Sequence, residues 1–300
     1  MDIPDGERRI EHGKPLDLRR TLQPLQVWSR DPSLRVSERE VAWAIRSPEG
    51  PVSLRLLATK AAVLAQVWGP GSAWALSRIE DFVGLNDDLE SFAPSDPRIQ
   101  DMLHLHPGIR LPRTWRIVSM LVPLVLGQLV TGVEAKRAYE QLERRLGEPA
   151  PGPLELRLRP DPARLAGLSE ATYVACGALA RQGRTIKALC AVAHRMEEAA
   201  GMGFVQAADR LQALPGLGPW TAGSAMLQGM GFPDTIILGD YHMANTVAWN
   251  LAGEARADDH RMVDLLRPFK GHRGRVLRLL GVAGSSAPSH GPRMALRSWS

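Results

Sequence analysis

The stretch "LPGLGPWTA", residues 214–222, constrains this chain more than any other segment. Gly216 and Gly218 permit positive φ and a close backbone approach that a Cβ would obstruct. Pro219 suits the first turn of a helix, where its missing N–H is no loss. Apolar positions on both sides predict two packed helices, so the free N–H groups of the turn point outward and can bind an anion. A tight joint between two core helices that binds nothing has the same local pattern.

A second segment, "ILGDYHMANTVAWNL" (237–251), follows at a short distance. Gly239 interrupts the chain, and the apolar spacing after it predicts a helix over 240–251. Asp240 then stands where a carboxylate accepts N–H groups from the first turn of a helix. Taken alone, an ordinary helix cap is the simplest interpretation of Asp240.

The first hundred residues show the alternation typical of strands. The segment "VAWAIRSPEGPVSLRL" (41–56) predicts two strands around an "SPEG" turn, and "AAVLAQVWG" (61–69) predicts a third. Helical spacing then predicts a helix over 71–85. A proline-rich passage that contains a short helix ends in loop-like sequence near residue 110. We therefore expect a mixed α/β N-terminal domain over 1–110, with disorder over its first ~15 residues.

From about residue 113 onward the pattern is helical. Thr131 and Glu134 form a capping box, which predicts a helix that ends at Gly147. Further helices are predicted over 170–180, 183–200, 204–213, 219–230, 240–251, 258–267 and 273–283. The fold class is thus α+β, with a mostly helical domain over 111–300 whose last ~16 residues form an irregular basic tail.

The charge of the chain is uneven. Its net charge is +5 and its pI about 9.6. No acidic residue follows Asp264, whereas seven basic residues do: Arg267, Lys270, Arg273, Arg275, Arg278, Arg293 and Arg297. Such a segment suits a polyanion such as nucleic acid, although a solvated basic surface has the same composition.

Cysteine and hydropathy limit the class of protein further. Two cysteines exclude a four-thiolate zinc or iron–sulfur site within one chain. No apolar run reaches the ~18 residues of a membrane span. The polar N-terminus, which mixes acids with bases, is no secretory signal. We expect a cytoplasmic, nucleoid-associated protein.

The motifs together indicate a family. "LPGLGPWTA", followed at this distance by the aspartate of "GDYH", resembles the helix–hairpin–helix GPD superfamily of DNA glycosylases. "HPGIRLPRTW" and "LVPLVLGQLVTGVEAKRAYEQLERRLGE" are similar to the entry of this fold in enzymes of the 3-methyladenine DNA glycosylase II type. The resemblance covers about residues 100–284. It implies a base-excision-repair enzyme that flips a damaged nucleotide out of duplex DNA and hydrolyses its N-glycosidic bond.

The resemblance also implies roles for single residues. Asp240 is the catalytic carboxylate, which stabilises the oxocarbenium-like sugar and orients the attacking water. Trp220 stands where bifunctional relatives carry a Schiff-base lysine, so we expect a monofunctional glycosylase without AP lyase activity. Its indole either stacks on a cationic alkylated base or packs in the core. The base pocket is expected to contain Trp220, Ser224, Tyr241 and His272, while His242 is either functional or structural.

The segment "GQLVTG" is where similar enzymes insert a side chain into the duplex. Leu129 is either this apolar wedge or one more core leucine. Gln128, beside it, is expected to touch the opposite strand.

The turn itself is the expected phosphate site. The resemblance implies that the amides of Gly216, Gly218 and Thr221 hold a phosphate, and that Lys270, Arg273 and Arg275 approach the DNA backbone. It further implies that a monovalent cation can be held by backbone carbonyls, which here are those of Gln212, Leu214 and Leu217. No other cofactor is expected.

The expected substrates are alkylated purines of the 3-methyladenine type in double-stranded DNA. The breadth of recognition is open, with 3-methyladenine, 7-methylguanine, ethenoadenine and hypoxanthine as candidates. One alternative is a glycosylase of the same fold for another lesion, such as a deaminated or etheno base. The other is a non-catalytic protein that binds damaged DNA. Retention of Asp240 argues against the latter, because a pure binder needs no carboxylate facing a polyanion. We expect a monomer.

Overall fold

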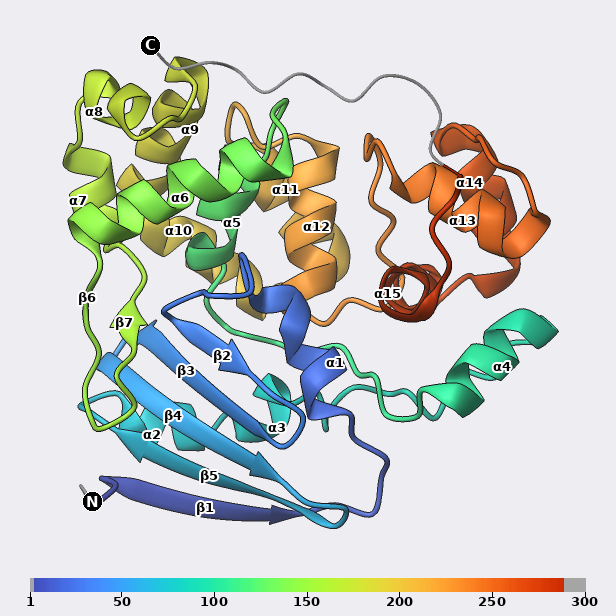
Figure 1. Ribbon diagram of the computed structural model, residues 1–300, viewed down its shortest axis with the longest axis horizontal. Helices are drawn as coiled ribbons and strands as arrows, with labels where there is room; N and C mark the ends of the chain where they lie inside the picture. The colour runs from blue at the N-terminus through green and yellow to red at the C-terminus, as the bar shows by residue number, and fades with distance from the viewer. Residues whose placement is uncertain (1–2, 289–300) are drawn as a thin grey trace.

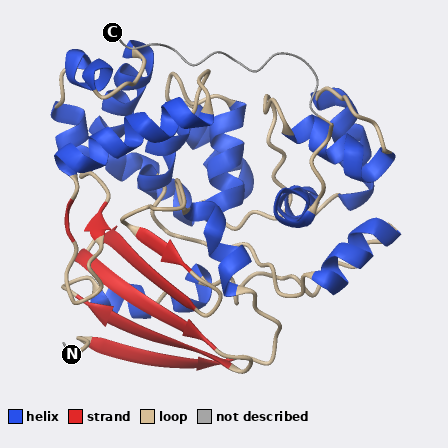
Figure 2. Cartoon of the chain, in the orientation of Figure 1, coloured by secondary structure: helices blue, strands red, loops and turns tan. Residues whose placement is uncertain are grey.

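The computed structural model describes residues 3–288, and the N-terminal part of the chain forms an antiparallel sheet (Figures 1 and 2). Its strands, in the spatial order β1-β5-β4-β3-β2, are β1 (Gly6–Glu11), β2 (Leu34–Val36), β3 (Glu40–Ser47), β4 (Gly50–Ala58) and β5 (Ala62–Trp68). In β3 and β4 the partners Val41–Leu56, Trp43–Leu54 and Ile45–Val52 face each other and are all buried. The three strands predicted from the alternation are therefore confirmed.

Short helices cover the buried face of this sheet. They are α1 (Leu18–Leu22), the 3₁₀ turn η1 (Gln23–Leu25), α2 (Ser72–Leu76) and α3 (Ile79–Phe82). The expectation of a single helix over 71–85 is wrong, because α2 ends at Leu76 with Ser77 as its C-cap residue. There the Ser77 hydroxyl donates to the Trp74 carbonyl at 2.8 Å, and such a bond competes with continuation of the helix. Trp74 and Trp43 both pack against Phe82, with ring centroids 5.6 and 5.4 Å away.

Strand β1 corrects the expectation for the N-terminus. Disorder over the first ~15 residues is wrong for residues 6–11, which pair along their whole length with β5. Ile10 is the one buried residue of this edge strand, so the hydrophobic alternation that marks the other strands is missing. Polar contacts fix it instead: the Arg8 guanidinium pairs with the Glu80 carboxylate, and Asp5 accepts the Gly69 amide at 2.6 Å.

The rest of the chain is mainly helical. Its elements are α4 (Pro97–Leu105), α5 (Val118–Leu126), α6 (Gly132–Leu146), β6 (Glu148–Pro149), β7 (Arg157–Leu158), α7 (Pro162–Gly167), α8 (Glu170–Ala175), α9 (Ala180–Ala191), α10 (Ala193–Glu197), η2 (Glu198–Gly201), α11 (Phe204–Gln212), α12 (Pro219–Gly229), α13 (Met243–Ala252), α14 (Asp259–Leu266), η3 (Arg267–Phe269) and α15 (Arg273–Ala283). The capping box at the start of α6 is present, and α6 ends at Gly147 as predicted. The predicted helix over 183–200 is divided into α9 and α10.

The helices form two lobes around separate hydrophobic cores. Helices α5, α6, α9 and α11 build the first core, whereas α13, α14 and α15 build the second. Helix α12 lies between them (Figure 1), with Met226 in the first core and Leu227 in the second. The turn before α12 therefore sits where the two lobes meet.

A segment of the N-terminal region completes the second core. Phe92, Ile99, Ile109 and Leu111 are buried there, and α4 lies beside α15 (Figure 1). The predicted domain boundary near residue 110 stays a prediction. The predicted irregular tail falls largely on residues 289–300, which lie outside the described part of the chain.

Within residues 3–288, no helix combines the length and apolar character that crossing a membrane requires.

A buried arginine, Arg159, joins the N-terminal segment to the first lobe. Its guanidinium donates to the hydroxyl of Ser33 at 2.9 Å, to the carbonyls of Leu25 and Ser119 at 2.9 and 3.1 Å, and to the carboxylate of Asp31 at 3.0 Å. Asp31 is itself 1% exposed. The Asp31 carboxylate is therefore stabilised in its buried position by the Arg159 guanidinium and by the backbone and hydroxyl donors around it.

Arg159→Met should lower the free energy of unfolding by about 3–5 kcal/mol, because it leaves the Asp31 carboxylate charged and buried without its partner. Arg184→Met, at the exposed Arg184–Glu170 pair, should cost less than about 1 kcal/mol. Urea unfolding of the three proteins measures both differences. Equal losses in the two variants would contradict a structural role for Arg159.

Glu143 on α6 generates a pH-dependent prediction. Burial raises the pKa of its carboxyl from 4.5 to about 8, and Asp31 adds to the effect. Between these two pH values the folded protein keeps a proton that the unfolded chain releases, so Glu143 lowers stability increasingly as the pH rises through this window. Glu143→Gln should raise the unfolding midpoint at pH 8 and leave it nearly unchanged at pH 5. A gain of the same size at both pH values would show that the effect is not ionisation.

Candidate active site

The turn between α11 and α12 has the geometry that its glycines indicate. Gly216 adopts φ +95°, and a Cβ at this position would lie 2.3 Å from the hydroxyl oxygen of Thr185. Both the conformation and the close approach therefore require glycine. Gly218 is the extended N-cap of α12, Pro219 fills its first position, and Leu217 between them is buried. The predicted pair of helices joined by a tight turn is therefore confirmed, as α11 and α12.

The carboxylate of Asp240 is held from two sides. Its Oδ1 accepts the backbone N–H groups of His242 and Met243, both at 2.9 Å. Helix α13 begins at Met243 with His242 as its N-cap residue, so Asp240 bonds to the start of the helix from three residues before it and is not the cap residue itself. Its Oδ2 accepts the indole N–H of Trp220 at 2.8 Å. The two lobes thus meet at a hydrogen bond between Trp220, the second residue of α12, and Asp240, which lies three residues before α13. Trp220 and Asp240 are both partly exposed, so a ligand can reach them.

A second carboxylate supports this loop and was missed by the sequence analysis. Asp259, at the start of α14, accepts the backbone N–H of Gly239 at 2.7 Å. Gly239, with φ +77°, directly precedes Asp240. Asp259 therefore fixes the backbone from which the Asp240 side chain projects. Its only local signal in the sequence was its place in the first turn of a predicted helix.

The arrangement can stabilise a positive charge. A carboxylate has about four lone-pair positions, and the three donors that hold Asp240 leave part of its hydrogen-bonding capacity unused. These donors are neutral, so they orient the carboxylate without compensating its charge. Preorganised charge of this kind is the form of electrostatic catalysis that needs no rearrangement during the reaction.

Two of the other expected pocket residues are placed differently. Tyr241 is 81% exposed and presents its ring edge to His242, with centroids 4.8 Å apart. Ser224 is buried inside α12 and 3% exposed. An open pocket-lining role for Ser224 is therefore wrong in this structure, because the next turn of α12 lies within the packed core.

His272, the remaining expected pocket residue, is engaged with the N-terminal segment. Its ring packs on Phe92 with centroids 5.0 Å apart, it lies 3.4 Å from the Ser91 hydroxyl, and its Nδ1 accepts from the Arg275 Nε at 3.3 Å. Burial and the neighbouring Arg275 charge lower the pKa of His272. These contacts are with Ser91, Phe92 and Arg275 rather than with Trp220 or Asp240.

The basic residues before and within α15 differ in availability. Lys270 is exposed. Arg273 forms two bonds with Asp234, at 2.7 and 2.6 Å, in a partly exposed pair. Arg275 is 3% exposed and forms two 2.7 Å bonds with Asp87. The predicted DNA contact of Arg275 is therefore wrong in this structure, since a buried carboxylate already occupies its guanidinium.

The segment before α6 resolves one alternative. Leu129 is 68% exposed and adopts φ +55°, so the interpretation of Leu129 as one more core leucine is wrong. Gln128 does not extend beside it. Its amide nitrogen donates to the Gly216 carbonyl and to the Thr221 hydroxyl, both at 2.8 Å, so the expected contact with an opposite strand conflicts with where this amide points.

The expected cation site stays a prediction. Of its three carbonyls, that of Leu214 accepts the backbone N–H of Leu217 at 3.0 Å. Residues 3–288 contain no group of three or more His, Cys, Asp or Glu side chains that could hold a metal ion.

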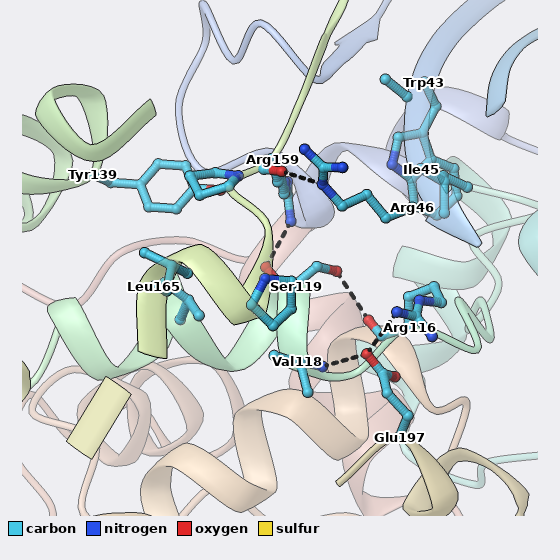
Figure 3. Close-up of a pocket in the computed structure, with 14 residues that line it drawn as sticks. Trp43, Ile45, Arg46, Arg116, Val118, Ser119, Tyr139, Arg159, Leu165 and Glu197 are labelled. Atoms are coloured by element: carbon cyan, nitrogen blue, oxygen red, sulfur yellow. Dashed lines mark hydrogen bonds and ion pairs between the residues drawn. The ribbon is translucent and has the colours of Figure 1, made fainter. Parts of the chain in front are cut away.

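A small cavity of about 40 Å³ lies elsewhere, between β3 and the first lobe (Figure 3). Arg46, Arg116, Arg159 and Glu197 line it, and Trp220 and Asp240 do not. Glu197 accepts the Ile117 N–H at 2.6 Å, and burial raises the pKa of its carboxyl. This cavity belongs to the packing of the first lobe against the sheet.

Comparison with known proteins follows the same lines. No family model matches the chain. The chain is 30% identical to a probable bifunctional transcriptional activator/DNA repair enzyme AlkA of Mycobacterium tuberculosis. The aligned stretch of 183 residues covers 55% of this chain. The match spans about a third of that relative's length, 34%.

Solved structures match over nearly the whole chain. A 3-methyladenine DNA glycosylase from Archaeoglobus fulgidus superposes with a TM-score of 0.76 at 15% identity, covering 91% of this chain and 97% of that one. An 8-oxoguanine glycosylase/lyase of Clostridium acetobutylicum, in complex with double-stranded DNA, gives a TM-score of 0.61 at 13% identity, with coverages of 83% and 96%. The predicted α+β class is confirmed, and the chain has the fold of the helix–hairpin–helix DNA glycosylases that its paired motifs resemble.

Proposed function

We propose that this chain is a monofunctional DNA glycosylase of base excision repair, which releases alkylated purines of the 3-methyladenine type from duplex DNA by hydrolysis. One observation carries the proposal. The Asp240 carboxylate is fixed by the Trp220 indole and by the backbone amides of His242 and Met243 at the start of α13, beside a turn built to present backbone N–H groups. The identity to the AlkA-type repair enzyme supports the alkylated substrate.

The chemistry follows from the position of the charge. When the base leaves, the electrons of the C1′–N bond go with it and C1′ becomes cationic, so a nearby carboxylate lowers the energy of the transition state. Water then adds through its oxygen to C1′ and loses a proton. An N-alkylated purine is already cationic and leaves readily. A strong general acid is therefore dispensable, and one carboxylate is sufficient.

Double-stranded DNA is the proposed partner. The amides of Gly216, Gly218 and Thr221 at the start of α12 suit a phosphate, and exposed Lys270 supplies a positive charge. The similarly folded Clostridium glycosylase/lyase is described with double-stranded DNA. We propose that the protein acts as a monomer in the cytoplasm, at the nucleoid.

Absence of AP lyase activity is part of the proposal. A lyase of this type needs an amine to form a Schiff base with C1′. Trp220 stands at the expected place of that amine, and an indole nitrogen cannot form such a bond. The bifunctional Clostridium relative shares the fold alone at 13% identity.

Asp240→Asn tests reaction and catalyst together. The single amide oxygen can accept either from the indole or from the two backbone N–H groups but not from both, and the negative charge is lost, so base release should fall on the order of 10²–10³-fold while DNA binding persists. Chromatography of purines freed from methylated duplex DNA measures release, and a gel shift measures binding. Asp101→Asn, on the exposed side of α4, is the control and should keep wild-type release.

Two outcomes would contradict this assignment. Full activity of Asp240→Asn would remove Asp240 as the catalyst. No release by the wild type, with lesion binding intact, would point first to another lesion class and then to a non-catalytic binder.

Trp220→Phe separates the two tasks of the indole. Phenylalanine keeps an aromatic face but cannot donate to Asp240, and a hydrogen bond to a charged group contributes roughly 1.5–3 kcal/mol. Base release should therefore fall about tenfold or more, and Trp220→Ala should reduce it further because stacking is also lost. Single-turnover rates measure both variants. Wild-type rates for Trp220→Phe would mean that only the ring face matters, and strand cleavage by any of these proteins without alkali would disprove the monofunctional assignment.

A further inference from the structure

The loop that joins α5 to α6, residues 127–131, carries a strained and exposed leucine. Leu129 is 68% exposed at φ +55°. Residues other than glycine rarely adopt this backbone conformation, and it persists only where the surroundings fix the backbone. The contacts on either side of Leu129 therefore determine where its side chain points.

The backbone before Leu129 is held by a buried glutamine of α9. Gln182 is 1% exposed, and its amide nitrogen donates to the carbonyls of Leu126 and Gln128 at 3.0 and 2.8 Å. Its amide oxygen accepts the Leu179 N–H at 2.8 Å. Two donated bonds and one accepted bond fix this side chain, so the end of α5 cannot move independently of α9.

The backbone after Leu129 is held by the capping box of α6. Thr131 accepts the Glu134 N–H at 3.3 Å, and the Glu134 carboxylate accepts the Thr131 N–H at 2.8 Å. Only Leu129 and Val130 then lie between two fixed points of the chain.

Gln128 connects this loop to the hairpin. Its amide nitrogen donates to the Gly216 carbonyl and to the hydroxyl of Thr221, both at 2.8 Å. Thr221 is 1% exposed, so its hydroxyl is inaccessible to solvent as a competing partner. The two acceptors stand on opposite ends of the turn, and one side chain therefore bridges the loop to both.

Helix α9 also approaches the turn at Gly216. Thr185 lies one turn after Gln182, and its hydroxyl is the atom that a Cβ at Gly216 would meet at 2.3 Å. Gln128 thus bonds the loop of residues 127–131 to the hairpin, Gln182 bonds the same loop to α9, and Thr185 of α9 packs closely against Gly216.

We propose that Gln128 is a positioning residue that fixes Leu129 relative to the phosphate-binding turn, so that both engage the duplex as one rigid unit. The inference rests on the proposed function, because it assigns Leu129 to the gap that a flipped nucleotide leaves. With loop and turn joined, the nucleotide displaced by Leu129 stands at a fixed offset from the phosphate held by the turn. No ordering of the loop is then needed when the base leaves the stack.

Gln128→Met tests this role because it keeps the length of the side chain and removes both hydrogen bonds. Base release from duplex DNA should fall about tenfold, as expected for two lost bonds, one of them to the buried hydroxyl of Thr221. Release from the same lesion in single-stranded DNA, where no stack must be opened, should stay near the wild-type rate. Thr221→Val removes one of the two acceptors and should cause a smaller loss. Gln206→Met, at an exposed position of α11, should release the base from duplex at the wild-type rate.

A double-mutant cycle with Leu129→Ala identifies the route. If Gln128 acts through Leu129, Gln128→Met in the Leu129→Ala background should change the duplex rate less than twofold. Independent, multiplying losses would overturn the proposal. A loss of equal size on single-stranded DNA would also overturn it, since Gln128 would then support the turn alone.

A measurement on the free protein keeps this test separate from that of the proposed function. Absence of base release by the wild type would refute the function, not the contact. Gln128→Met should still speed amide hydrogen exchange in residues 128–131 about tenfold relative to the interior of α6, because local opening follows the lost bonds. Unchanged exchange in that segment would overturn the positioning role.

Discussion

Burial of α12 between two cores sets the geometry of the whole candidate site. Its side chains are small on most faces, and a Cβ at Gly229 would lie 2.0 Å from the sulfur of Met120, so neighbouring elements approach the helix backbone closely. The turn with Gly216 precedes this helix, Thr221 lies in its first turn, and Trp220 reaches from it to Asp240 across the lobes. A rigid central helix therefore places the backbone donors, the indole and the carboxylate together, and neither lobe could do so alone.

Asp240 differs from three other carboxylates of the molecule in the groups that hold it. Asp31, Asp87 and Asp234 each face an arginine, which compensates their charge. Asp240 is held by an indole and two backbone amides, which orient the group without compensating its charge. Neutral donors of this kind leave a field that can act on a cationic sugar.

Local patterns in the sequence predicted what local physics determines. Alternation gave the three central strands, the Thr131–Glu134 spacing gave the start of α6, and the glycines gave the turn. Strand β1 was not predicted, because an edge strand with one buried residue shows no clear alternation of apolar and polar residues. Arg275 was misassigned because its partner Asp87 is 188 residues away, and a run of basic residues looks exposed until such a partner is known. The φ of Leu129 could not be foreseen either, since bonds from α9 and α12 impose it.

The Asp87–Arg275 pair has a consequence for how the chain comes together during its synthesis. The second lobe takes Phe92, Ile99 and Ile109 from the first 110 residues and α15 from residues 273–283, so its core cannot close until α15 has been synthesised. Contacts of such long separation form slowly because a large loop must be closed first. The sheet has all its strands by Trp68 and can fold early. The segment that follows must wait with its apolar residues exposed, and this stretch of the nascent chain is where a chaperone would be needed most.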